Sequence, residues 1–207
     1  MPTIYGRVTS SNVMKVLWTA DELGLEYERL DAGLSFGVVD TPAYRAMNPN
    51  GRVPTYVDGD LVLWESNAIV RYLSAKHSAG SFWPEDPGPR AQLDRWMDWQ
   101  QTVQTVSITP VFWGLVRTAP ADRDPKAIAA GVDAINAAMG ILDAHLDGRT
   151  WIAGDAFTMA DIPQGPNLHR YFNLDFKRPD LPNLRRFYDA MLDRPAYRKH
   201  IADIPIS

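Results

Sequence analysis

The chain has 207 residues, of which 45% are hydrophobic and 22% charged, a composition that supports a folded core and excludes a largely disordered protein. Its formal net charge of −4 leaves no basic surplus for a phosphate backbone, which argues against a nucleic-acid partner. The absence of cysteine excludes disulfides, thiolate metal ligands and a cysteine nucleophile, and the four scattered histidines lack the paired spacing of a metal site.

Residues 1–78 alternate short extended runs with helical patterns. The sequence predicts four strands, at residues 3–8, 27–30, 52–57 and 61–64. It predicts helices at residues 12–23, 42–47 and 65–75, the first ended by Gly24. The turn Asp58-Gly59-Asp60 is typical of a hairpin between the last two strands. This order fits a mixed four-stranded sheet flanked by helices.

Residues 79–89 contain three prolines and two glycines, and their composition predicts a linker between domains. Beyond them the pattern is entirely helical, which predicts a second, all-helical domain over residues 90–207. We expect helices at 90–117, with a kink or break at Pro110, at 126–146, from Thr158 onward, at 181–192 and at 196–201. The chain starts without a signal peptide, and no apolar run approaches the roughly 20 residues that span a bilayer, so we expect a cytoplasmic protein without a membrane partner.

The motif Gly51-Arg52-Val53-Pro54-Thr55, followed by Trp64-Glu65-Ser66-Asn67-Ala68-Ile69, suggests a peptide-binding edge. A cis Val53–Pro54 bond would expose the Val53 backbone to an extended peptide. The helix that opens at Glu65-Ser66 would offer free N–H groups to a carboxylate, with Glu65 near an amine. The alternative is that Pro54 only starts an edge strand and Ser66 only caps a helix, and motif chemistry leaves both open. Arg52 is either a carboxylate ligand or a solvated charge.

The segments 48–54 and 65–73 resemble the glutathione-binding core of cytosolic glutathione transferases, most closely the bacterial serine-type members. The resemblance covers essentially the whole chain. It implies a thioredoxin-like α/β domain followed by an all-α helical bundle, with glutathione as co-substrate and no metal. Residues 157–162 resemble the family's capping box, in which Thr158 and Asp161 cap each other's N–H groups. The prolines and glycine at 163, 165 and 166 depart from that pattern and predict a bend.

The resemblance places the reactive centre at the turn formed by residues 9–12, where a hydroxyl holds the glutathione sulfur as a thiolate. Counting back from Gly24 by the spacing of serine-type members lands on Ser10. Ser11 and Asn12 are the neighbouring candidates, with Asn12 as a helper or a substitute. Ser10 or Ser11 could also serve only as a helix cap.

The second-substrate pocket is expected on the long helix of the second domain. The candidates are aromatic, aliphatic and amide side chains at helical spacing, namely Trp96, Trp99, Gln100, Val103, Phe112 and Trp113. A stripe of this kind can equally belong to the core or to a dimer interface. His169 and Phe172 are weaker candidates.

The first functional hypothesis is a detoxifying transferase that joins the glutathione thiolate to a small hydrophobic electrophile. A glutathione-dependent reductase or isomerase, or a non-enzymatic binding module of the same fold, are the alternatives. We also expect a homodimer, partly from the resemblance and partly from the aromatic residues and arginine around Arg71, Tyr72, Trp96 and Trp99.

Overall fold

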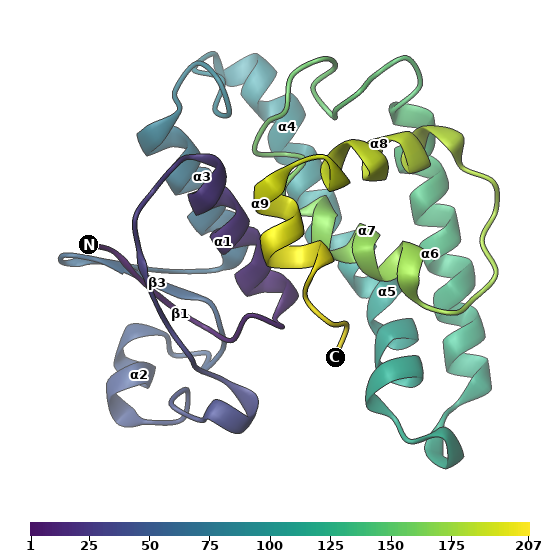
Figure 1. Cartoon of the computed structure of the whole chain (residues 1–207), viewed down its shortest axis with the longest axis horizontal. Coiled ribbons are helices and arrows are strands. Elements are labelled where there is room, and N and C mark those ends of the chain that lie inside the picture. The colour runs from purple at the N-terminus through teal and green to yellow at the C-terminus, as the bar shows by residue number, and fades with distance from the viewer.

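The computed structural model describes residues 1–207 as a small sheet-containing domain packed beside a larger helical one (Figure 1). The sheet has the order β2-β1-β3-β4, with β1 parallel to β2 and antiparallel to β3. Its strands are β1 (Thr3–Tyr5), β2 (Glu28–Leu30), β3 (Thr55–Asp58) and β4 (Leu61–Trp64). The predicted mixed four-stranded sheet is therefore confirmed, although β1 and β3 are shorter than the sequence predicts.

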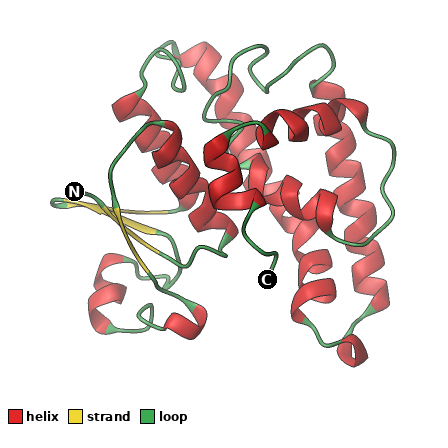
Figure 2. Ribbon diagram, in the orientation of Figure 1, coloured by secondary structure: helices red, strands yellow, loops and turns green.

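Helices α1 (Ser11–Glu22) and α3 (Ser66–His77) lie between the sheet and the helical domain, whereas α2 (Pro42–Met47) lies on the opposite side (Figure 2). Apolar residues of α1 and α3 pack on the sheet and form the smaller of two hydrophobic cores. Gly6 permits this packing, because a Cβ atom there would lie 2.3 Å from a methyl group of Val13.

The second domain consists of α4 (Pro87–Trp99), α5 (Thr105–Phe112), α6 (Pro125–His145), α7 (Gln164–Asn173), α8 (Pro182–Leu192) and α9 (Pro195–Tyr197). Wide π-type turns at 100–104 and 113–117 join and extend α4 and α5, so the chain stays helical from Pro87 to Arg117. Pro110 lies inside α5 and does not break it. Helix α4 also begins inside the predicted linker, because Asp86 accepts a bond from the Gly88 N–H at 2.8 Å.

The prediction of a helix starting at Thr158 is wrong. Residues 159–163 form turns, and α7 begins only at Gln164, directly after Pro163. Asp161 accepts bonds from the N–H groups of Thr158, at 2.7 Å, and Ile152, at 2.8 Å. The hydroxyl of Thr158 accepts from the backbone N–H of Ala160, not from the backbone N–H of Asp161 as predicted. The two residues therefore fix a loop and do not cap a regular helix.

Helix α6 corrects a second expectation. Its 21 residues have a window of mean hydropathy 1.4, so by length and composition it could span a membrane. In the structure it packs on α5 and α8, with Ile135, Met139 and Leu142 buried in the larger core. The sequence analysis overlooked this apolar run, which forms an alanine-rich helix of the bundle.

The two domains meet along α1. Trp18 is fully buried and packs edge-on against Tyr197 with ring centroids 4.9 Å apart. One turn later, Glu22 pairs with both guanidinium nitrogens of Arg194, at 2.6 and 2.7 Å. Apolar packing and a bidentate ion pair thus fix the helical domain against the helix that carries the predicted reactive turn at its other end.

Candidate active site

The turn between β1 and α1 presents three side chains with unused donors. Ser10 is the N-cap of α1 and is buried, yet its hydroxyl neither caps the helix nor makes another hydrogen bond. Asn12 uses its side-chain oxygen to accept from Lys15 and Ser66, which leaves its NH₂ group unbonded. Ser11 is partly exposed and likewise makes no side-chain bond. The N-terminus of a helix, with such donors beside it, favours an anion.

Lys15 is a site residue that the sequence did not reveal. It is almost fully buried, and its ammonium group lies among four side-chain oxygens. These are Oδ1 of Asn12 at 3.1 Å, Oγ of Ser66 at 3.5 Å, Oδ1 of Asn67 at 3.3 Å and Oε1 of Gln100 at 3.0 Å. One cation thereby ties the reactive turn to the start of α3 and to the second domain.

The charge of Lys15 is held at high cost. Burial lowers the pKa of Lys15 to about 7, a shift opposed by the carboxylate of Glu65 and reinforced by the positive charge of Arg170. All four of its hydrogen-bond partners are neutral. An anion bound nearby would therefore stabilise the ammonium form.

The loop before β3 contains the predicted cis bond and leaves the Val53 backbone without a hydrogen-bond partner. The Val53–Pro54 bond is cis, and neither the N–H nor the C=O of Val53 enters a backbone hydrogen bond. The preceding carbonyl, of Arg52, accepts from the hydroxyl of Tyr44 at 2.7 Å and from the amide of Asn48 at 2.9 Å. These buried contacts hold the loop so that the Val53 groups stay available to a ligand. The side chain of Arg52 is exposed and makes no hydrogen bond or ion pair.

The start of α3 has the geometry of an anion site. Glu65 has a φ of 71°, which is unusual for a residue with a side chain and is typical of functional positions. Ser66 opens the helix, is buried, and donates to Asn12 Oδ1 at 3.3 Å. The free N–H groups of this first turn lie beside the Lys15 ammonium, so dipole and charge act together.

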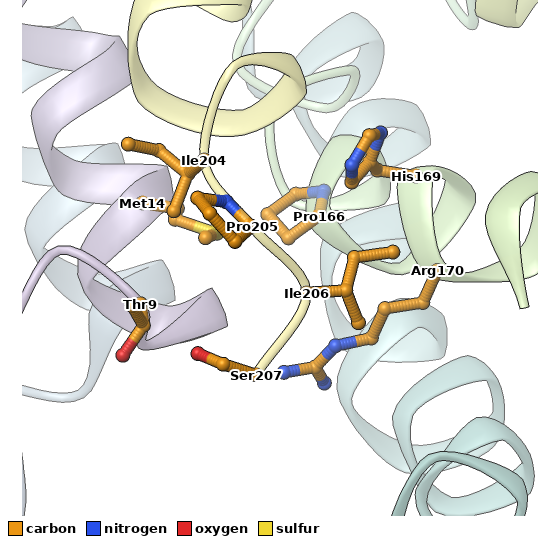
Figure 3. Close-up of a pocket in the computed structure, with 9 residues that line it drawn as sticks. All are labelled: Thr9, Met14, Pro166, His169, Arg170, Ile204, Pro205, Ile206 and Ser207. Carbon is orange, nitrogen blue, oxygen red and sulfur yellow. The ribbon is translucent and has the colours of Figure 1, made fainter. Parts of the chain in front are cut away.

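A second pocket opens on the other side of the reactive turn (Figure 3). It lies between the first domain, α7 and the last residues of the chain, and its lining includes Thr9, Met14, Pro166, Arg170, Ile204 and Ile206. Its cavity volume of about 10 Å³ suits roughly one water molecule. Residues 204–207 run across the pocket and form part of its lining.

None of the six predicted second-substrate residues lines this pocket. Trp96 is buried in the helical core against His145, and Gln100 is fully buried at Lys15. Trp99 and Val103 are partly buried against the same core, and Trp113 is exposed. Phe112 comes nearest, because its ring lies 3.9 Å below the guanidinium of Arg170. His169 lines the pocket, whereas Phe172 does not.

Comparison with known proteins identifies the family of the chain. The family model of the glutathione S-transferase N-terminal domain matches residues 2–75, and that of the C-terminal domain matches residues 125–190. Glutathione S-transferase GstB of Escherichia coli K12 is 43% identical over 209 residues, with both chains covered to 100%. Glutathione S-transferase 3 of Zea mays is 32% identical, covering 98% of this chain and 94% of the relative.

A solved structure is equally similar. The theta class glutathione S-transferase of Xanthomonas axonopodis pv. citri, crystallised with glutathione bound, has a TM-score of 0.95 at 44% identity, covering 100% of this chain and 99% of that one. The chain is therefore similar to known glutathione S-transferases in both sequence and architecture over its full length. The chain belongs to the glutathione S-transferase family, among its bacterial members, and is an enzyme of that family.

Proposed function

We propose that this transferase binds glutathione along the edge formed by Val53, Pro54, Glu65 and Ser66. The cysteinyl part of the tripeptide pairs with the backbone N–H and C=O of Val53 as an added strand. The γ-glutamyl carboxylate binds the first turn of α3 at Ser66, and its amine faces Glu65. The observation that carries the proposal is the unpaired Val53 backbone beside a cis proline. Arg52, exposed and unpaired, is available to the glycine carboxylate.

The sulfur then lies at the turn of residues 9–12. We assign the hydrogen bond to the thiolate to the hydroxyl of Ser10, with the NH₂ group of Asn12 as helper, because both donors lack another partner and Ser10, unlike Ser11, is buried. Ser11 remains the third candidate. A donated hydrogen bond and the positive end of α1 favour thiolate over thiol and lower the thiol pKa. The thiolate is the nucleophile, and the protein supplies its ionisation and its orientation.

The second substrate is a small electrophile that enters from the pocket beside Thr9. The apolar side chains of Met14, Ile204 and Ile206 support an apolar body for this molecule. Of the helix candidates, Phe112 is the one that remains close, under Arg170. Conjugation consumes the reactive carbon, so a detoxifying role in the cytoplasm is the physiological part of the proposal.

The enzyme acts as a homodimer in this proposal, although the residues that suggested it serve other purposes. Arg71 pairs with Asp94 and Asp98 of its own chain, both at 2.6 Å, and Trp96 is buried. Large exposed apolar side chains instead lie on β4, at Trp64, and on the α5 side, at Val106. A second copy that covers them would remove apolar surface from water. Light scattering should give about twice the 23.2 kDa monomer mass.

Binding of glutathione can be tested by thermal unfolding. A ligand at about a hundred times its Kd stabilises a fold by about 2.7 kcal/mol, which corresponds to a rise of roughly 5–10 °C in Tm for a chain of this size. The matched control is S-methylglutathione, which keeps both carboxylates and the amine but has no thiol. Both compounds should stabilise the protein, and only glutathione should react. The absence of any shift with either compound would refute the proposed site.

A further inference from the structure

Three arginines from distant parts of the chain converge beside the second pocket. Arg7 lies between β1 and α1, Arg117 is the last residue of the helical stretch after α5, and Arg170 belongs to α7 and lines the pocket (Figure 3). Arg117 and Arg170 lie on the same aromatic ring, with their guanidinium carbons 5.7 and 3.9 Å from the centroid of Phe112. The charges of the three arginines also act on one another. Burial, followed by the charges of Arg117 and Arg7, lowers the pKa of Arg170 to about 10. Burial and Arg117 also lower the pKa of Arg7.

No acidic side chain neutralises this cluster. None of the ion pairs in the structure involves Arg7, Arg117 or Arg170. The Nε atom of Arg7 is buried without a hydrogen-bond partner. The guanidinium of Arg170 makes no hydrogen bond either, although its carbon lies 3.9 Å from the centroid of the Phe112 ring. Arg7 and Arg170 thus carry like charges that are partly desolvated and unpaired, which opposes folding, and such groups concentrate where a ligand supplies the missing charge.

The cluster already holds one oxygen from the protein itself. Arg117 donates from Nη2 to the Ser207 oxygen at 2.5 Å, on the segment that lies across the pocket. Figure 3 shows the side chain of Arg170 extending toward the same residue. Arg117 therefore already donates to an oxygen at this end of the pocket, close to the lining residue Arg170. Arginine also suits carboxylates in particular, because its planar fork can donate two parallel hydrogen bonds.

The position of the cluster indicates that the anion it would bind belongs to the second substrate, and not to glutathione. The pocket touches the reactive turn at Thr9, one residue before Ser10, and its other walls come from α7 and residues 204–207. The proposed glutathione groups lie instead along Val53 and the start of α3. A molecule held at Arg170 would thus face the sulfur from the helical domain.

We propose that the electrophile of this transferase carries a carboxylate, which binds Arg170 with Arg7 and Arg117 beside it, while its reactive carbon faces the glutathione sulfur. This inference rests on the proposed function. In the reaction with an aryl chloride, the sulfur–carbon bond forms, the carbon–chlorine bond breaks and chloride leaves with the bonding pair. The carboxylate is unchanged, and it serves to orient the carbon and to neutralise the arginines.

The test compares two substrates with the same reacting ring, 4-chloro-3,5-dinitrobenzoate and 4-chloro-3,5-dinitrobenzamide. Each kcat/KM is divided by the rate of the uncatalysed reaction with glutathione, so that intrinsic reactivity cancels. We expect the wild type to prefer the carboxylate by roughly tenfold to a hundredfold, the range of one charge-assisted pair. Arg170→Met should reduce this preference to near parity, whereas Arg170→Lys should keep part of it. Arg95→Met removes an exposed, unpaired arginine elsewhere and should leave the preference unchanged.

Several outcomes would overturn the inference. These are parity in the wild type, an unchanged preference in Arg170→Met, or conjugation of neither compound although calorimetry shows that glutathione binds. Weaker glutathione binding in Arg170→Met would assign the cluster to the tripeptide instead. If Arg170→Met does not fold, the exposed Arg117→Met takes its place and should lower the preference severalfold. Failure of the wild type to bind glutathione at all would refute the proposed function itself.

Discussion

Each domain contains a buried charged side chain, and the two are satisfied in opposite ways. Asp161, in the helical domain, receives bonds from the backbone N–H groups of Ile152 and Thr158. Lys15, in the first domain, donates only to side chains, two of which, Asn12 and Ser66, belong to the proposed glutathione site. Backbone partners are fixed by the fold, whereas side-chain partners can exchange one ligand for another. Asp161 is therefore structural, and Lys15 can respond to what binds.

The largest effect should follow from Asp161→Ala. It leaves the N–H groups of Ile152 and Thr158 buried without acceptors, at roughly 1–3 kcal/mol each, so the free energy of unfolding should fall by about 2–5 kcal/mol. Urea unfolding measures this loss. Asp161→Asn keeps one acceptor and should lose less, and Asp133→Ala, at an exposed position, should lose almost nothing. If the free energy of unfolding falls by less than about 1 kcal/mol in Asp161→Ala, Asp161 does not have the structural role that distinguishes it from Lys15.

Lys15→Met should separate binding from stability. The methionine fills the site without a charge, so stability should change little at pH 7, but glutathione should bind roughly tenfold more weakly because one charge-assisted contact is lost. Isothermal titration calorimetry measures the affinity. Lys126→Met, at an exposed position on α6, is the matched change in net charge and should bind as the wild type does. Equal affinities in both variants would make Lys15 structural as well.

The same variant should change the dependence of stability on pH. In the folded protein the pKa of Lys15 is lowered to about 7, below its unfolded value of about 10.5. Between these values the unfolded chain binds more protons, so the contribution of Lys15 makes stability rise with pH. Burial raises the pKa of Asp161 to about 7, and its contribution makes stability fall between about pH 4 and 7. Urea unfolding at pH 7 and 9 should show that the free energy of unfolding rises less between these pH values in Lys15→Met than in the wild type.

A separate effect concerns the sulfur. Loss of one hydrogen bond to a charged group, about 1.5–3 kcal/mol, should raise the pKa of the bound thiol by about 1–2 units in Ser10→Ala. Conjugation should slow at pH 7 and recover as the pH rises, with glutathione affinity nearly intact. Ser11→Ala should differ little from the wild type, and Asn12→Ala should combine non-additively with Ser10→Ala. If only Asn12→Ala shifts the thiol pKa, the amide is the sulfur ligand and Ser10 is not.

Local signals predicted the first domain better than the second. Helix α2 and strand β4 have the predicted bounds, since proline, glycine and alternating apolar residues mark their ends. The cis Val53–Pro54 bond followed from a local motif in the same way. The start of α7 did not, because a buried carboxylate organises residues 158–163 as turns before the helix can begin.

Lys15 and the arginine cluster illustrate what a sequence pattern leaves out. A lysine within an amphipathic helix is typical of the solvent face, and this one is enclosed by Ser66 and Asn67, about 50 positions away, and by Gln100, 85 positions away. Arg7, Arg117 and Arg170 are likewise far apart in the chain and share no motif. Both groups arise from packing between domains, which periodicity along one segment does not encode.

The course of residues 204–207 has a practical consequence for anyone who handles the enzyme. Because this segment lies across the pocket beside Arg170, a purification tag fused after Ser207 would start beside the pocket that we propose for the second substrate. Met1 is 82% exposed and lies at the outer end of the sheet, away from the pocket (Figure 1). Affinity handles, fluorophores and surface tethers are therefore best attached ahead of Met1, so that kinetic assays report on an unobstructed site.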